Sequence, residues 1–208
     1  MSRKNTLSRL KTKERETRKS LIVEAAERVY AIKPYNKVSM REIAYEAGIA
    51  TSSIYTYFPN QEALFVEATL KEANKLIDEM NNSIKDRPDE EVVEKVINGF
   101  IDFISKNDSF FRMMVLFMTQ GALSDESLMK LNTAMRRGLD VFDNLFHNIE
   151  YDGNIRLFSH LAFASLNGIL VTFRKLPGRS EEEIISHMKE VGRIFGTMIL
   201  NMKKKSAV

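Results

Sequence analysis

Residues 39–58 read SMREIAYEAGIATSSIYTYF and decide the fold of this 208-residue chain. Ser39, with Glu42 three positions later, is a capping box, in which each side chain accepts the backbone N–H of the other residue at a helix start. Gly48 stands where a helix commonly ends with a positive φ angle. A second short segment begins at Thr51. The stretch is therefore predicted to form two brief helices joined by a tight turn, a helix-turn-helix.

The second of these helices carries many hydroxyl groups for its length. Ile54 is its inward residue, and the hydroxyl-bearing residues around it are Thr51, Ser52, Ser53, Tyr55, Thr56 and Tyr57. Hydroxyl groups hydrogen-bond to phosphates and to base edges in the major groove. The segment thus favours DNA contact. For Tyr55 and Tyr57 the alternative is a half-buried place in the core, and for Ile54 and Phe58 the core is the better interpretation.

The composition predicts an all-α fold. The chain has no cysteine, 4 prolines and 9 glycines, and apolar residues recur at helical spacing along most of it.

No uninterrupted apolar run reaches the roughly 18 residues that span a bilayer. The polar, basic N-terminus lacks the apolar core of a signal peptide. We therefore expect a cytoplasmic protein with no membrane partner.

Basic charge is concentrated at the N-terminus. Residues 1–19 contain eight Lys or Arg and two Glu, so they carry a net charge of +6 in a chain whose total is +3. Such a segment is either a solvated tail or an arm that binds a polyanion. Because it directly precedes the helix-turn-helix, we interpret residues 1–13 as a flexible basic arm that contacts DNA.

The remaining chain predicts a two-domain plan. An amphipathic helix is expected from about Glu14 to Lys33, and a long helix after Pro59, with Asn60 as its N-cap. Residues 14–75 then form a three-helix DNA-binding domain with its motif at 39–58. Beyond Pro88 the chain becomes rich in Phe, Met, Leu and Ile. Residues 76–208 are therefore expected to form a second, larger helical domain.

The last two helices of this domain indicate a second subunit. The helix at residues 157–173 is apolar on more than one side, and the final helix follows a second capping box, Ser180 with Glu183. This final helix bears two apolar stripes, the flatter of which is Ile185, Gly192, Gly196 and Ile199. Two stripes need two packing partners, one inside the subunit and one outside it. We expect a homodimer formed through the last two helices.

A segment rich in Phe and Met belongs either to the core or to the wall of a cavity. Residues 110–118, FFRMMVLFM, are apolar nearly all round, which usually means burial in a core. Phe and Met side chains also suit a cavity for an aromatic molecule or an acyl chain. Core packing is the better interpretation for any single one of these residues, and the family resemblance given below favours a pocket for a small apolar or aromatic effector. Its predicted contacts are Phe103, Phe110, Met114, Phe117, Met118, His147, Phe163 and Asn167.

The sequence contains no recognisable catalytic or metal-binding pattern. The three histidines lack the i,i+4 spacing of a metal-binding pair, and no cysteine accompanies them. A nucleophile motif, a phosphate-binding glycine loop and paired carboxylates are also missing. We therefore predict no enzymatic activity, no cofactor and no metal site.

The motif resembles the DNA-binding domain of the tetracycline-repressor (TetR) family of transcriptional regulators. The matching segments are residues 39–44 (SMREIA), 47–49 (AGI), 54–58 (IYTYF) and 62–65 (EALF). The resemblance implies a homodimer whose N-terminal domains read a palindromic operator in double-stranded DNA. It also implies that the helical domain of residues 76–208 serves ligand binding and dimerisation, and that binding of a small molecule releases the DNA.

The resemblance assigns DNA contacts position by position. Ser39, Arg41 and Tyr57 would meet phosphate, and Gln61 stands where the family often has a lysine near the DNA backbone. Ala50 replaces a serine that often caps the reading helix, so the cap comes from Thr51 or is lost. The full predicted set is Ser39, Arg41, Thr51, Ser52, Ser53, Tyr55, Thr56, Tyr57 and Gln61.

Two functions are considered for the whole chain. The first is a ligand-responsive transcriptional regulator, a repressor that leaves its operator when the effector binds. The alternative is a helical small-molecule carrier whose N-terminal module has weak or lost operator binding, which Ala50 and Gln61 keep open. Preference for one DNA sequence over others separates the two.

Overall fold

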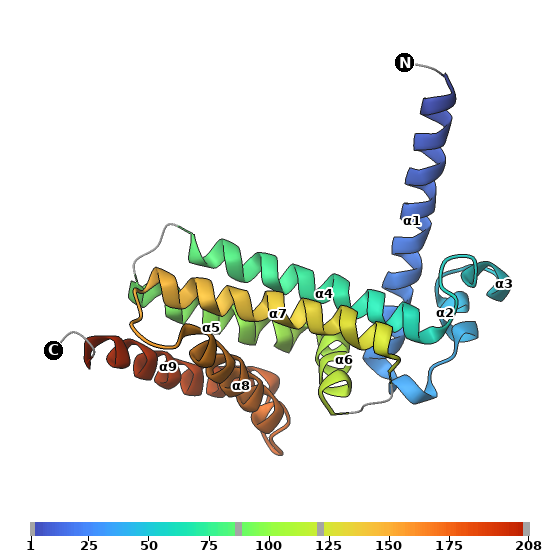
Figure 1. The fold of residues 1–208 in the computed structure, drawn as a ribbon. Coiled ribbons are helices and arrows are strands. Elements are labelled where there is room, and N and C mark those ends of the chain that lie inside the picture. The colour runs from blue at the N-terminus through green and yellow to red at the C-terminus, as the bar shows by residue number, and fades with distance from the viewer. Residues whose placement is uncertain (1–2, 86–88, 120–122, 206–208) are drawn as a thin grey trace. The chain divides into compact units, whose positions relative to one another are not determined.

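A computed structural model of the chain describes residues 3–85, 89–119 and 123–205 (Figure 1). The described residues form helices and no strands, which confirms the predicted all-α fold. The elements are α1 (Arg3–Ile32), the 3-10 helix η1 (Tyr35–Lys37), α2 (Met40–Glu46), α3 (Thr51–Ile54), α4 (Gln61–Ile84), α5 (Asp89–Lys106), α6 (Asp108–Thr119), α7 (Asp125–Asn148), α8 (Ile155–Phe173) and α9 (Glu181–Lys205).

The chain divides into two compact units. Unit 1 comprises the chain through Lys71 together with Ser109–Leu131, and unit 2 comprises Glu72–Asp108 together with the chain from Asn132 onward. Helices α4 and α7 each contribute residues to both units. Almost all of α6, which lies within the range of the second predicted domain, is grouped with α1, α2 and α3 in unit 1.

Helix α1 is longer than the sequence pattern predicted. Apolar periodicity indicated a start near Glu14, but the helix begins at Arg3 and so includes most of the segment expected to be an arm. Its second half is amphipathic and buries Ile22, Ala25 and Tyr30 in unit 1. Residues 8–18 are exposed, so this part has no apolar face by which periodicity could reveal a helix.

The helix-turn-helix forms as predicted. Ser39 caps α2, because its hydroxyl accepts the backbone N–H of Glu42 and the Glu42 carboxylate accepts the N–H of Ser39. Gly48 has a φ of 68°, the left-handed conformation that turns the chain out of a helix at little cost for glycine. Ile43 and Ile54 are fully buried. Both short helices are therefore held by the core of unit 1.

Unit 2 is built on packing among α5, α8 and α9. The second predicted capping box is present, with Ser180 and Glu183 exchanging hydrogen bonds at the start of α9. The flatter apolar stripe predicted on α9, which contains Gly192, packs inside the subunit. A Cβ on Gly192 would lie 2.7 Å from Cγ2 of Ile97 on α5. The apolar stripe that α9 leaves exposed is instead Ile194, Met198 and Met202.

Helix α8 combines an apolar composition with an exposed face. Its length and hydropathy reach those of a membrane-spanning helix, and only 33% of it is buried. A search of the sequence for uninterrupted apolar runs does not find this helix, because Arg156 and His160 interrupt its apolar residues. Leu157, Leu161 and Val171 are exposed, and their spacing places them on one side of the helix. An apolar face of this kind also suits packing against another protein chain.

Candidate nucleic-acid interface

The start of α2 presents Arg41 beside the closed capping box. The Ser39 hydroxyl also donates to Glu42 at 3.0 Å, so part of its hydrogen-bonding capacity is used within the motif. The Lys33 ammonium, and after it Ser39, lower the pKa of Glu42. Arg41 is exposed, and Tyr45, one turn further on the same face, is 87% exposed. The predicted set of DNA contacts omits Tyr45. Its position four residues after Arg41 places it on the same helix face, which could have suggested it as a further contact.

Helix α3 and the turn after it expose the hydroxyl groups expected to read DNA. Tyr55 is 51% exposed and Tyr57 is half-buried, while Ile54 and Phe58 are buried as expected. Ala50 is the N-cap of α3 and makes no side-chain cap hydrogen bond. The sequence left two possibilities, a cap from Thr51 or no side-chain cap, and α3 has no side-chain cap. Besides Tyr55, the exposed hydroxyl-bearing residues are Thr51, Ser52, Ser53 and Thr56.

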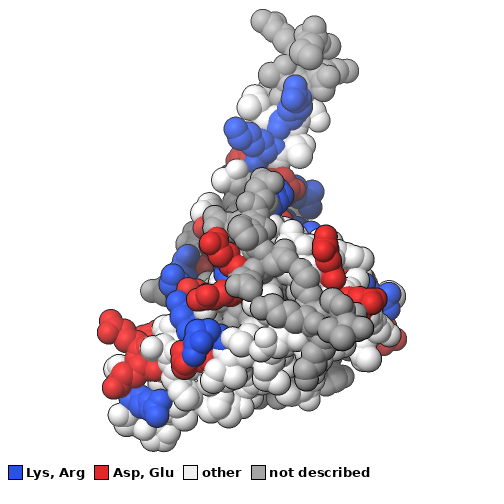
Figure 2. All heavy atoms as spheres, turned by 90° about the vertical axis from the view of Figure 1, so that its left-hand side faces the viewer, with Lys and Arg blue, Asp and Glu red and all other residues white. Residues whose placement is uncertain are grey.

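Basic residues of α1 lie beside these hydroxyl groups. One surface hollow of unit 1 is lined by Lys11, Glu14, Arg15, Arg18, Thr56 and Tyr57. A second hollow places Arg18 with Ser53 and Tyr57. Figure 2 shows basic side chains on the described N-terminal part of α1. We name the exposed hydroxyls of residues 51–57 together with Lys11, Arg15 and Arg18 the reading surface.

The reading surface supplies positive charge that α3 itself lacks. Lys11, Arg15 and Arg18 fall three or four positions apart and so share one face of α1. Arg18 is also paired with Glu14 at 2.7 Å, with both side chains largely exposed. An exposed pair of this kind is weak, so it leaves the guanidinium available to a phosphate. The sequence predicted that basic residues of this region contact DNA. The spacing of three or four positions between these cations could have identified them as one face of a helix.

Gln61 is engaged inside unit 1. Its amide nitrogen donates to the backbone oxygen of Tyr35 at 2.7 Å, so the side chain that was expected near the DNA backbone holds η1 against the start of α4. Asn60 caps this helix as predicted, with its Oδ1 accepting the backbone N–H of Ala63 at 2.7 Å. Side-chain hydrogen bonds of Asn60 and Gln61 therefore fix the start of α4.

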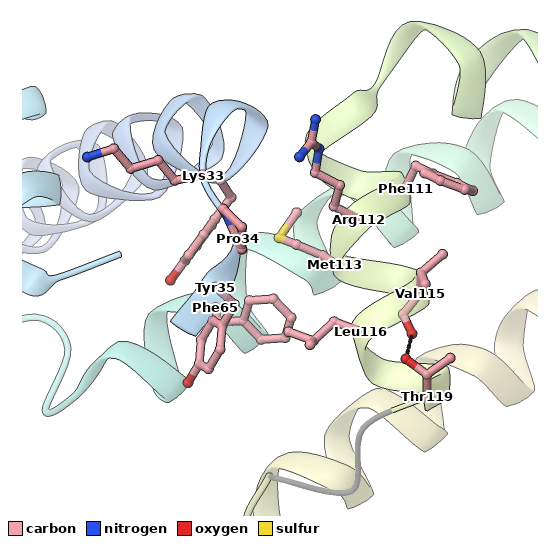
Figure 3. Close-up of a pocket in the computed structure, with 11 residues that line it drawn as sticks. Lys33, Pro34, Tyr35, Phe65, Phe111, Arg112, Met113, Val115, Leu116 and Thr119 are labelled. Atoms are coloured by element: carbon pink, nitrogen blue, oxygen red, sulfur yellow. Dashed lines mark hydrogen bonds between the residues drawn. The ribbon is translucent and has the colours of Figure 1, made fainter. Parts of the chain in front are cut away.

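A cavity of about 250 Å³ lies within unit 1 (Figure 3). Three aromatic rings form much of its wall: Tyr35 and Phe65 have ring centroids 4.8 Å apart, and Tyr30 and Phe65 5.6 Å apart. Met113 of α6 also lines the cavity (Figure 3). The other lining residues are Lys33, Pro34, Phe111, Arg112, Val115, Leu116 and Thr119.

The predicted effector residues of α6 lie on its other face. Phe110 and Met114 are buried, Phe117 is half-buried and Met118 is 41% exposed. None of these four lines the cavity of unit 1. Six residues that line the cavity belong to the same helix as these four. The predicted segment is therefore next to the cavity, but the predicted side chains do not line it.

The other four predicted effector residues belong to unit 2. Phe103 is buried on α5, and Phe163 of α8 packs on Phe142 with ring centroids 6.4 Å apart. Asn167 is buried and its amide nitrogen donates to the backbone oxygen of Phe163 at 2.7 Å. His147 is exposed on α7. The eight residues are therefore divided between the two units, and their role in effector binding stays a prediction.

Metal-binding side chains do not gather in the part of the chain that the structure describes. No group of three His, Cys, Asp or Glu residues is placed there so that it could hold an ion.

Comparison with known proteins matches the helix-turn-helix region to a described family. The family model "Bacterial regulatory proteins, tetR family" matches residues 22–68. An uncharacterized HTH-type transcriptional regulator of Haemophilus influenzae is 30% identical over 101 residues, which are 48% of this chain and 49% of that protein. The chain thus matches about half the length of this relative.

Two further similarities extend beyond the motif. The "fatty acid metabolism regulator protein" of Bacillus subtilis is 24% identical over 159 residues, covering 73% of this chain and 81% of that protein. The crystal structure of the transcriptional regulator FadR from Bacillus subtilis in complex with stearoyl-CoA has a TM-score of 0.71 at 21% identity. The match covers 84% of this chain and 96% of that one. At this identity the likeness establishes a shared fold for most of the chain.

Proposed function

Because the chain belongs to the TetR family of bacterial regulatory proteins, we propose that it is a ligand-responsive transcriptional repressor that binds a palindromic operator. In this proposal residues 14–75, with the basic segment 1–13, form the DNA-binding part. Residues 76–208 bind the effector and dimerise. The protein acts in the cytoplasm, where the DNA is, and no catalytic step is part of its function.

The reading surface is the observation that carries the proposal. Ser53 of α3 and the hydroxyl-bearing residues of the turn after it line hollows together with cations of α1. Groups that can select bases therefore lie beside groups that can neutralise phosphates. Since α3 contains no Lys or Arg, most of the affinity comes from α1 and most of the sequence choice from α3. Tyr57 touches both parts and is proposed to bind a phosphate.

The exposed faces of α8 and α9 support a homodimer. The two helices pack on each other within unit 2, and each leaves an apolar stripe in solvent, with Leu161 and Met198 more than half exposed. Gly168 of α8 is also exposed, with open space around its missing Cβ. Two copies of such a pair can bury these stripes in an isologous four-helix contact. Two reading helices about 34 Å apart then fit successive major grooves.

An acyl thioester is the effector class that we propose to test first. The similar Bacillus subtilis structure contains stearoyl-CoA, and a relative is described as a fatty acid metabolism regulator. The abundance of Phe and Met in this chain, 13 and 11 residues, suits an acyl chain, because both side chains adapt their shape. The effector must bind the DNA-free state more tightly, because only a difference in affinity shifts the equilibrium.

The experiment is a nuclease footprint on the DNA upstream of the protein's own gene, repeated with stearoyl-CoA. The proposal expects protection of one palindromic sequence by a dimer, whose mass is measured by light scattering, and loss of protection when the thioester is added. A carrier protein would instead take up the thioester without protecting any sequence. That result, or a monomer at micromolar concentration, contradicts the proposal.

A further inference from the structure

We propose that the cavity of unit 1 is a second effector site, which takes a small aromatic molecule with one negative charge and acts directly on the helix-turn-helix. The binding itself is independent of the function proposed above, but its effect on DNA affinity rests on that function. The site lies wholly within unit 1, and an acyl thioester is far too large for it.

The walls of the cavity select a flat apolar body. Tyr30, Tyr35 and Phe65 supply ring faces and edges, and Tyr35 and Phe65 meet at an interplanar angle of 62°. Aromatic rings pair favourably in edge-to-face or offset-stacked arrangements, so these three rings can contact the ring of a ligand. Met113 is buried and receives the Thr69 hydroxyl on its sulfur at 3.5 Å, and a Met side chain adapts to the shape of a ligand.

The volume sets the size of the ligand. A dry protein cavity of about 150 Å³ holds one benzene ring, and sites for drug-sized ligands begin at about 300 Å³. At about 250 Å³ the cavity therefore fits one substituted aromatic ring, and it is too small for a long acyl chain.

The charges around the cavity favour an anion. Its lining contains no carboxylate and two basic residues. The ammonium of Lys33 pairs with Glu42 outside the lining, so the attraction for an anion rests on Arg112. Arg112 is exposed, and Figure 3 shows its guanidinium at the edge of the group of lining side chains. The hydroxyl of Tyr30 is buried and makes no hydrogen bond of normal geometry within the described residues. Burial, and next the neighbouring Tyr35, raise the pKa of Tyr30 far above its usual value, while the Gln61 side chain acts in the opposite direction, and the protonated hydroxyl can donate to a ligand carboxylate.

Two lining residues connect the cavity to the helix-turn-helix. The ammonium of Lys33 pairs with Glu42 of the α2 capping box, while its stem lines the cavity. The ring of Tyr35 lines the cavity, while its backbone oxygen accepts the Gln61 amide at the start of α4. A ligand that displaces the Lys33 stem or the Tyr35 ring therefore disturbs both helices that flank the reading surface. We expect it to weaken operator binding.

The binding test uses phenylacetate and its uncharged amide, 2-phenylacetamide, with the full chain labelled on its methionine methyl groups. Phenylacetate is expected to shift the NMR signal of Met113, assigned with Met113→Leu, with a Kd of about 1 mM or tighter, a range that a ligand of this size reaches. Leu116→Phe fills the cavity and should abolish the shift for both compounds. Arg112→Gln should weaken phenylacetate about tenfold and leave the amide unchanged.

Controls separate these effects from loss of structure. Arg136→Gln removes an exposed arginine of α7 and should change neither affinity. Arg112→Gln alters an exposed residue, so it keeps the test valid if Leu116→Phe does not fold, which circular dichroism will show. Absence of a Met113 shift, or equal weakening of acid and amide by Arg112→Gln, overturns the assignment of the site.

The coupling test measures operator affinity with and without phenylacetate. We expect a loss of at least about fivefold, and Lys33→Met, which keeps an apolar stem but no charge, should reduce this loss while phenylacetate still binds. An unchanged operator affinity with a shifted Met113 signal overturns the coupling. If the protein binds no DNA but Met113 shifts as expected, the proposed function fails and the site stands. If it binds its operator and Met113 does not shift, the site alone fails.

Discussion

Lys33 lines the cavity of unit 1 and forms an ion pair with Glu42, the residue that closes the capping box of α2. This ion pair is one of the contacts that join the end of α1 to the helix-turn-helix. Both side chains are more than one third exposed, so solvent screens the pair. Its importance lies in position, because it connects the cavity to the motif.

The stability of unit 1 should depend on pH through Glu42. Its pKa is lowered in the folded protein, mainly by Lys33 and next by Ser39, from an ordinary value of 4.5. The contribution is therefore present above pH 4.5 and is lost as the pH falls through the lower folded-state pKa. We expect Glu42→Gln to lower the urea midpoint at pH 7 and to match the wild type in strong acid. The same pH dependence should shrink in Lys33→Met, and an identical difference at all pH values contradicts this account.

Removing the cap of α2 should destabilise the motif. Ser39→Ala deletes the hydroxyl that accepts the Glu42 N–H, and loss of such a cap costs about 1 kcal/mol. Urea denaturation followed by circular dichroism measures the change. Ser52→Ala is the matched control, because Ser52 is exposed on α3 and should change the free energy of unfolding little. Equal effects of the two substitutions would exclude a capping role for Ser39.

Charge on α1 should govern the salt dependence of DNA binding. Arg15→Gln removes one cation of the reading surface, and removing one cation that neutralises a phosphate reduces the slope of log K against log salt by about 1. Fluorescence anisotropy over a salt series gives the slope. Lys95→Gln, which removes an exposed cation of α5 in unit 2, should leave it unchanged. If both variants keep the wild-type slope, Arg15 does not contact DNA.

The hydroxyl of Tyr57 should strengthen binding to all DNA sequences alike. Tyr57→Phe keeps the half-buried ring and removes the proposed phosphate contact, which should weaken operator and random DNA by about threefold to tenfold. Anisotropy with both DNAs measures the ratio. Tyr151→Phe, in unit 2, is the control for loss of a tyrosine hydroxyl. Weakening confined to the operator would instead assign Tyr57 to a base.

Local chemistry between residues close in sequence was the most predictable part of the structure. Ser39 with Glu42 and Ser180 with Glu183 form the expected capping boxes, and Gly48 has the expected positive φ. These features depend on residues three positions apart or on the conformation of one residue, so no knowledge of the tertiary structure is needed to find them.

Exposed or uniformly apolar helices were the least predictable. Residues 8–18 of α1 are exposed, so the helix has no apolar stripe there to mark its start. Helix α6 is apolar nearly all round, so its composition could not tell which face lines a cavity. The structure lines it with Phe111, Val115 and Leu116, whereas the predicted residues of this helix lie on the opposite face. Distinguishing the faces requires knowing that α1 and η1 pack nearby, which is a contact between distant parts of the sequence.

The division of labour in the reading surface is tested most directly by a specificity ratio. Anisotropy at physiological salt measures the affinity for the footprinted operator and for a scrambled duplex, in the wild type and in Thr51→Val with Ser52→Ala. We predict that the wild type prefers the operator about a thousandfold or more. In the double variant this preference should collapse, while the affinity for the scrambled duplex stays unchanged because α1 supplies it. Equal affinity of the wild-type protein for both duplexes would contradict the central claim that this chain reads a DNA sequence through α3.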